Sequence, residues 1–123
     1  FIFLEDGDWE SADEYCEKVL DIDPECGEAY LGKLLAEMKV GNREELKNCE
    51  QPFDGNSNYR KIMKFGDDSL KKELADINKR NEANLIAYEK KSKSKKIALS
   101  IFVALLILAF VWAILYQLLW WRF

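Results

Sequence analysis

The run Asp54-Gly55-Asn56-Ser57-Asn58 is rich in side-chain oxygens and is similar to the opening of a calcium-binding loop. A calcium loop of this kind needs glycine at its sixth position for a sharp turn and a bidentate glutamate at its twelfth. Tyr59 and Phe65 stand at those two positions. The run therefore predicts a turn in which Asn or Ser caps the following helix, and no metal site.

No other residues form a recognisable reaction centre. The chain has no histidine, which is the commonest general base and metal ligand near neutral pH. No cysteine pair has zinc-site spacing, no glycine-rich phosphate loop is present, and no nucleophile stands with a base. We therefore expect a protein that is not an enzyme and that has no cofactor and no metal.

The three cysteines, Cys16, Cys26 and Cys49, are odd in number and widely spaced. This usage favours free thiols in a reducing compartment over a disulfide framework. Cys16 falls on the apolar side of a predicted helix, so we interpret it as a core residue at a helix–helix contact and not as a reactive thiol.

Charge is distributed unevenly along the chain. Residues 1–55 carry 16 acidic against 5 basic residues, a net charge of −11, whereas residues 56–89 are nearly neutral. Solubility of an exposed helix face is the simpler explanation of the acidic residues, and a docking site for a basic partner is the alternative. A nucleic-acid partner is not expected, because it requires a basic surface.

The last part of the chain is apolar. Residues 97–121 carry no charge, and 25 helical residues extend about 37 Å, more than the roughly 30 Å hydrocarbon core of a bilayer. A helix in the core of a soluble domain would show a polar stripe, and none exists here. The segment predicts one transmembrane helix, with the lipid bilayer as a partner.

The residues that flank this segment predict its orientation. Five lysines lie between Lys90 and Lys96, whereas Arg122 alone follows the apolar run. The positive-inside rule then places the N-terminal part in the cytoplasm of a single-pass protein of the cell membrane. A topology signal is the favoured interpretation of the lysines, with attraction of anionic headgroups as the alternative. The residues expected at the membrane interfaces are Lys95, Lys96, Trp120 and Trp121.

Helical periodicity dominates the first half of the chain. Trp9, Ala12, Cys16 and Val19 recur at helical spacing, with acidic residues on the other face and Asp8 placed to cap the helix. A second apolar stripe runs from Tyr30 to Met38, and Asn42 followed by Glu45 matches a capping box. The pattern predicts an all-α hairpin.

These residues also resemble a known family. The spacing of Gly7, Trp9, Ala12, Cys16, Val19 and Pro24 is similar to that of the second helix of a tetratricopeptide repeat, with Phe3 and Tyr30 at the aromatic positions of the adjoining helices. The chain also resembles bacterial membrane proteins in which such repeats precede a hydrophobic segment. The resemblance implies repeat-mediated protein binding. The second unit is degenerate, since Leu46 replaces its small alanine.

Four segments follow: a repeat-like hairpin region (1–55), capping helices (56–78), a polar and basic helical stalk (79–96) and the transmembrane helix (97–121). Leu70, Leu74 and Ile77 are expected to pack on the hairpin. Because the chain opens on Phe and an apolar run, we expect it to be a fragment of a longer protein. About one and a half repeats are present, so either upstream repeats are missing or the segment that follows acts as the cap.

The leading hypothesis is a membrane-anchored, non-enzymatic scaffold that binds an unidentified protein or peptide. The alternative is a passive anchor and spacer for a functional domain upstream of residue 1. In the resembled family the first helix of each hairpin lines the binding side. Matching that helix here nominates five surface-facing contacts: Glu28, Leu31, Leu35, Met38 and Lys39.

Overall fold

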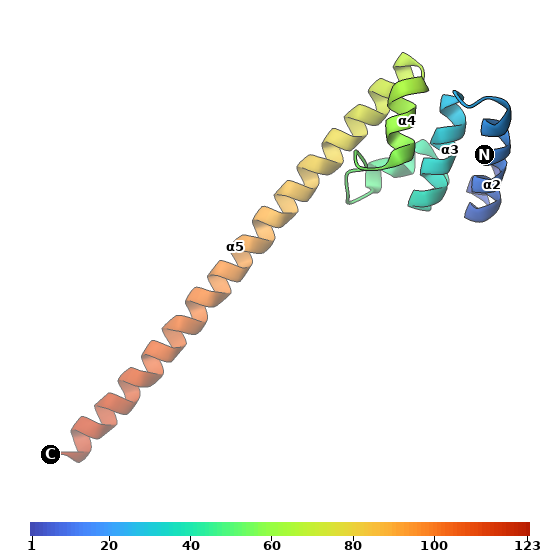
Figure 1. The fold of residues 1–123 in the computed structure, drawn as a ribbon. Coiled ribbons are helices and arrows are strands. Elements are labelled where there is room, and N and C mark those ends of the chain that lie inside the picture. The colour runs from blue at the N-terminus through green and yellow to red at the C-terminus, as the bar shows by residue number, and fades with distance from the viewer. The chain divides into compact units, whose positions relative to one another are not determined.

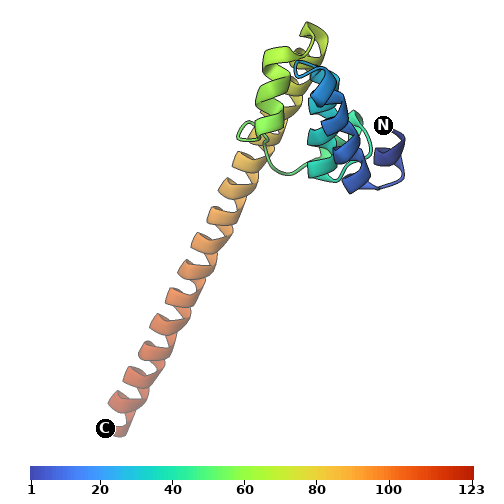
Figure 2. The ribbon, with the colours of Figure 1, turned by 45° about the vertical axis from the view of Figure 1, so that its right-hand side comes forward.

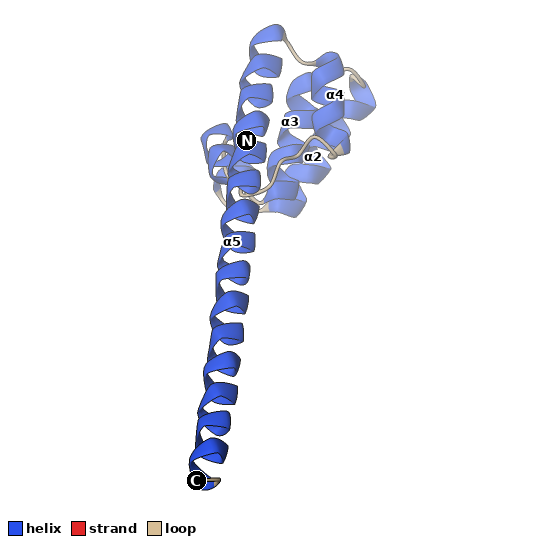
Figure 3. Cartoon of the chain, turned by 90° about the vertical axis from the view of Figure 1, so that its left-hand side faces the viewer, coloured by secondary structure: helices blue, strands red, loops and turns tan.

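The computed structural model describes residues 1–123, and every regular element in it is a helix (Figures 1 and 3). This confirms the predicted all-α class. By contacts the chain divides into two compact units, Phe1–Leu85 and Ile86–Phe123. In chain order the elements are α1 (Ile2–Glu5), α2 (Trp9–Ile22), α3 (Gly27–Met38), the 3-10 helix η1 (Arg43–Asn48), α4 (Ser57–Phe65) and α5 (Asp68–Trp121).

Helix α3 lies at the centre of the N-terminal unit, where it contacts α1, α2, η1 and α4 (Figure 2). It is apolar on more than one side, so it has faces to bury against helices on either side of it. The fully buried residues come from α3, η1, α4 and the first turns of α5. The largest of the apolar ones are Leu31, Leu34, Leu35, Leu46, Ile62 and Leu74.

Side-chain caps fix where these helices begin. The Asp8 carboxylate accepts a hydrogen bond from the Ser11 amide at 3.1 Å, which confirms the predicted cap of α2. The Asn42 side chain accepts from the Glu45 amide at 3.1 Å, as the capping box predicts, although the element that follows is the short 3-10 helix η1. The degenerate second repeat unit therefore has a 3-10 helix where a tetratricopeptide repeat would have its second α-helix.

The oxygen-rich run before α4 has the predicted capping role. Asn56 Oδ1 accepts hydrogen bonds from the amides of Asn58 and Tyr59, at 2.8 and 3.2 Å. The side-chain amides of Asn56 and Asn58 both donate to one carboxylate oxygen of Glu37, at 2.8 and 3.1 Å. The run thus begins α4 and ties it to the end of α3.

Glycine permits two close approaches in this unit. A Cβ added at Gly32 would stand 2.5 Å from the Cys16 sulfur, so α2 and α3 meet at this pair. A Cβ at Gly27 would stand 2.7 Å from the Gly66 Cα, where the start of α3 meets the turn between α4 and α5. Cys16 therefore lies at a helix–helix contact, as predicted.

Helix α5 supplies two buried asparagines that the apolar periodicity does not predict. Asn78 Oδ1 accepts from the Phe53 amide at 2.6 Å, and Asn81 Nδ2 donates to the Leu46 carbonyl at 3.2 Å. These bonds hold η1 and the loop that follows it against α5. Residues 79–85 belong to the N-terminal unit. The exposed stalk therefore begins later than the predicted Lys79.

The C-terminal unit, residues 86–123, consists of the remaining part of α5 and a short end. No residue of its most apolar stretch is buried against protein, and α5 is long and apolar enough to cross a membrane. A core helix of a soluble protein would be mostly buried. The predicted apolar helix is therefore confirmed, and its exposure is consistent with membrane anchoring.

Candidate functional site

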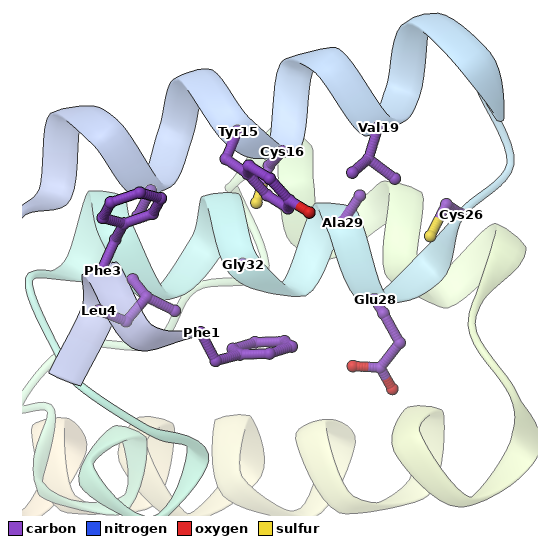
Figure 4. A pocket seen from close by; sticks show the side chains of 11 residues that line it. Phe1, Phe3, Leu4, Tyr15, Cys16, Val19, Cys26, Glu28, Ala29 and Gly32 are labelled. Carbon is purple, nitrogen blue, oxygen red and sulfur yellow. The ribbon is translucent and has the colours of Figure 1, made fainter.

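The main hollow of the N-terminal unit is an apolar groove between α1, α2 and α3, with a volume of 160 Å³. Helix α2 contributes one face of its surface at i, i+3, i+4 and i+7 spacing, and α3 contributes its first two turns (Figure 4). We call this hollow the N-terminal groove. Its lining residues are Phe1, Phe3, Leu4, Ala12, Tyr15, Cys16, Val19, Cys26, Glu28, Ala29 and Gly32.

Small side chains account for the hollow. Ala12 on α2 and Ala29 and Gly32 on α3 line it, and the two alanines are both 5% exposed. Because these side chains end at Cβ or earlier, the helices approach closely and leave space above them that no side chain of this unit fills. Figure 4 shows Gly32 and Ala29 below Cys16 and Val19 of α2. The groove is thus a consequence of the close α2–α3 contact.

Large aromatic residues stand at the rim of the groove. Phe1 and Tyr15 are about 60% exposed and Phe3 is 41% exposed. The Phe3 and Tyr15 rings lie 6.3 Å apart between centroids in a tilted arrangement. Exposed aromatic groups beside an apolar hollow are the composition typical of a binding surface.

One charged side chain lines the groove, that of Glu28. Its carboxylate pairs with Arg43 Nη2 at 3.3 Å, and Arg43 Nη1 also contacts Glu73 of α5 at 3.3 Å. Arg43 therefore ties three elements together and holds the Glu28 side chain in place. These groups are roughly half exposed, so the pairs orient the side chains more than they stabilise the fold.

Lys33 of α3 pairs with two acidic residues of α2. Its ammonium contacts the carboxylates of Asp13, at 3.1 Å, and of Glu17. Partial burial lowers the pKa of Lys33, but the hydrogen bonds to Glu17 and Asp13 outweigh it, and the pKa is raised overall. Lys33 thus stays charged and links α3 to α2.

The groove offers no activated nucleophile. Burial raises the pKa of the Cys16 thiol, with a further rise from the Asp13 carboxylate, so the neutral thiol predominates at neutral pH. Burial raises the pKa of the Cys49 thiol in the same way. No group of three or more histidine, cysteine or acidic side chains is placed to hold a metal ion. The arrangement suits non-covalent binding of apolar groups.

The nominated contact residues prove to be only partly available. Leu31 and Leu35 are 0% and 1% exposed, so their prediction as surface-facing contacts is wrong. The reason is that α4 covers the side of α3 that the family resemblance leaves open. Met38 is also partly buried and packs against the core. Of the five, Glu28 lines the groove and Lys39 is exposed at the end of α3.

The residues nominated as the repeat-motif core fall into two groups. Ala12 is buried, Trp9 and Tyr30 pack against the core, and Cys16 and Val19 line the groove. The remaining three are exposed: Phe3 stands at the groove rim, Gly7 adopts a left-handed turn with φ of 74°, and the exposed Pro24 accepts a 2.9 Å hydrogen bond from the Tyr30 hydroxyl.

Tyr30 also explains why α4 covers α3. Its ring stacks on that of Phe65, with centroids 6.1 Å apart and planes 18° apart.

The four nominated membrane-interface residues lie on the exposed part of α5, where Trp120 and Trp121 are 76% and 93% exposed and Lys95 and Lys96 are exposed as well.

Comparisons with known proteins give no assignment. No protein-family model matches the chain, and neither the curated proteins nor the solved structures contain a match.

Proposed function

We propose that this chain is a single-pass membrane protein whose N-terminal unit binds a protein or peptide through the N-terminal groove, without catalysis. The observation that supports this best is the groove itself: an apolar hollow of 160 Å³ with exposed aromatic residues at its rim. A cavity of about 150 Å³ is enough to hold a benzene molecule. The groove therefore has room for one aromatic or large aliphatic side chain of a partner.

Charge defines the kind of partner that fits. Residues 1–38, which build the groove, carry 12 acidic residues against two lysines, and Lys33 is already paired to Asp13 and Glu17. A negative surface favours encounter with a positive one and disfavours acidic partners. The proposed occupant is therefore a peptide segment with an apolar anchor side chain and flanking lysine or arginine residues.

The resemblance of residues 7–24 to a tetratricopeptide helix is consistent with protein or peptide binding in general, since repeats of that family bind proteins. In our proposal the binding surface differs from the one the resemblance nominates. It lies between α1, α2 and α3, because α4 occupies the other side of α3.

The proposal includes a cytoplasmic location of the N-terminal unit. Five lysines precede the apolar run of α5 and one arginine follows it, and this asymmetry supports cytoplasmic retention of the lysine side. Trypsin added to intact expressing cells should leave the N-terminal unit uncut, whereas trypsin added after permeabilisation should digest it. Digestion of the unit in intact cells would contradict the orientation.

A random 12-residue peptide library displayed on phage tests the binding. Panning against the full chain in lipid nanodiscs should enrich peptides with an aromatic or large aliphatic residue beside lysine or arginine, with Kd values of roughly 1–100 μM. Synthetic versions of the enriched peptides should bind Tyr15→Ala at least about fivefold more weakly, because this substitution removes an exposed rim aromatic group.

Ile22→Ala is the matched control. Ile22 is 88% exposed at the end of α2 and does not line the groove, so its substitution should leave peptide binding unchanged. Glu28→Gln should weaken binding of the basic peptides less than Tyr15→Ala does. Failure to enrich any peptide, or equal binding by Tyr15→Ala and Ile22→Ala, would contradict the proposal and favour the passive anchor and spacer.

A further inference from the structure

Five of the seven residues from 90 to 96, directly before the uncharged part of α5, are lysines. Lys90, Lys91, Lys93, Lys95 and Lys96 are all exposed, and none takes part in any of the five ion pairs of the structure. No acidic residue follows Glu89 in the chain. Glu89 is the nearest carboxylate in the sequence, and it forms no ion pair with any of these lysines, whose charges outnumber it five to one.

The lysines are not equivalent around the helix. At 100° per residue, Lys90, Lys93, Ser94 and Ile97 fall on one face at i, i+3, i+4 and i+7. These four residues, with Ile86 and Glu89, line one shallow hollow on the surface of α5. We call the surface formed by Lys90, Lys93, Ser94 and Ile97 the Lys90–Ile97 face. Lys91, Ser92 and Lys95 point to other sides of the helix.

The order of groups along this face matches a phospholipid. Two ammonium groups and a hydroxyl come first, and Ile97 opens the uncharged run that continues to Trp121. The seven residues from Lys90 to Lys96 rise about 9 Å along the helix axis, enough to cross one headgroup layer of roughly 5–8 Å. Lysine side chains near the end of a membrane helix also extend toward the headgroups.

We propose that the Lys90–Ile97 face binds the headgroup of an anionic phospholipid, with the phosphate between Lys90, Lys93 and Ser94 and an acyl chain along Ile97. Ammonium groups and a hydroxyl donate hydrogen bonds to phosphate oxygens, and the low dielectric of the interface strengthens the attraction. A soluble acidic partner would not use Ile97, because that residue opens the segment proposed to enter the bilayer. The inference rests on membrane insertion of α5 and is independent of the N-terminal groove.

Spin-labelled lipids test this inference. The full chain is reconstituted in vesicles of 80 mol% phosphatidylcholine and 20 mol% phosphatidylglycerol that contain trace spin-labelled phosphatidylglycerol or phosphatidylcholine. The protein-associated fraction of each probe is read from its electron spin resonance spectrum. We expect association of phosphatidylglycerol to exceed that of phosphatidylcholine by roughly threefold or more, and to weaken in 0.5 M NaCl.

Two triple variants of equal charge separate this face from the lysine run as a whole. In the first variant, which combines Lys90→Gln, Lys93→Gln and Ser94→Ala, the ratio of phosphatidylglycerol association to phosphatidylcholine association should fall close to one. The second variant, which combines Lys91→Gln, Lys95→Gln and Ser92→Ala, should keep most of the preference for phosphatidylglycerol. Both variants remove two positive charges and one hydroxyl, and all six positions lie on the surface of α5, so loss of folding does not explain a difference.

Three results would overturn the inference: an equal association of the two lipids with the wild-type chain, an equal loss of preference in both triple variants, or a larger loss in the second one. A chain that immobilises neither lipid probe has not inserted. That result would overturn membrane anchoring as well, and it is distinguishable from the other three.

Discussion

The two units of this protein use the same apolar residue types in opposite surroundings. In the N-terminal unit Leu31, Leu34 and Leu74 are 0% exposed, each enclosed by side chains of other helices. In the C-terminal unit Leu108 is 64% exposed and Phe110 is 69% exposed. The hydrophobic effect requires both sets to leave water. Protein side chains remove the first set from water, whereas the second set needs another apolar medium.

Polar groups show the same contrast. In the N-terminal unit buried asparagines pair with backbone groups, and the acidic residues remain on the surface. In the C-terminal unit the run from Ile97 to Trp121 contains no charge, and the backbone groups of the helix are satisfied within it. A single helix with that composition meets the requirements of a lipid environment without a partner helix.

The largest effect is expected from charges in the middle of the apolar run. Leu106→Arg with Phe110→Arg places two guanidinium groups near its centre, at a cost of about 6 kcal/mol, since each arginine there costs roughly 3 kcal/mol. This cost offsets the several kcal/mol by which the apolar side chains of the run favour insertion into the bilayer. The variant should be extracted from membranes by alkaline carbonate, whereas the wild-type chain and a Glu82→Arg, Glu89→Arg control should stay in the pellet.

A change of intermediate size should separate the two leucine environments. Leu74→Ala leaves a cavity in the core and should lower the free energy of unfolding of the N-terminal unit by about 3 kcal/mol. Leu108→Ala, on the exposed part of α5, should change that quantity by less than about 0.5 kcal/mol. Urea titration followed by circular dichroism in nanodiscs measures the free energy of unfolding of both variants. Equal losses of this free energy in Leu74→Ala and Leu108→Ala would contradict a difference between the two leucine environments.

The smallest effect concerns a cap on the surface of the N-terminal unit. The hydrogen bonds from Ser11 lower the pKa of Asp8 below its ordinary value of 3.8. Because the folded-state pKa is depressed, the ionised cap stabilises the fold above the unfolded-state pKa, and this contribution is lost as the pH falls through the folded-state value.

The difference in urea midpoint between the wild-type chain and Asp8→Ala should therefore be constant from pH 7 to pH 5 and shrink below pH 3.8. Leu74→Ala serves as the control, because a cavity in an apolar core carries no such pH dependence. A difference for Asp8→Ala that persists unchanged to pH 2 would show that the cap acts without its charge.

Local signals in the sequence predict most of the elements. The caps at Asp8, Asn42 and Asn56 and the helical spacing of Leu70, Leu74 and Ile77 involve residues within a few positions of each other, and the structure contains them as expected. The apolar run of α5 is predicted for the same reason, since its length and composition are properties of one segment.

The candidate site could not be predicted in the same way. The groove residues come from three separated elements, and their hollow exists because Gly32 lets α2 approach α3 at Cys16. The apolar pattern of α3 identifies Leu31 and Leu35 as apolar, but it does not show which side of the helix a neighbour will cover. The stacking of Tyr30 on Phe65 brings α4 to that side, and so the expected binding face is buried.

The amino-acid sequence is sufficient to predict the helical class, the starts of the capped helices and the uncharged segment that suits a membrane. Which apolar faces are enclosed, where Asn78 and Asn81 find their partners and where an open groove is left depend on how the helices pack. The physical reason is range: capping, periodicity and hydropathy are set within a few residues, whereas burial depends on helices that are distant in the chain and meet only after folding.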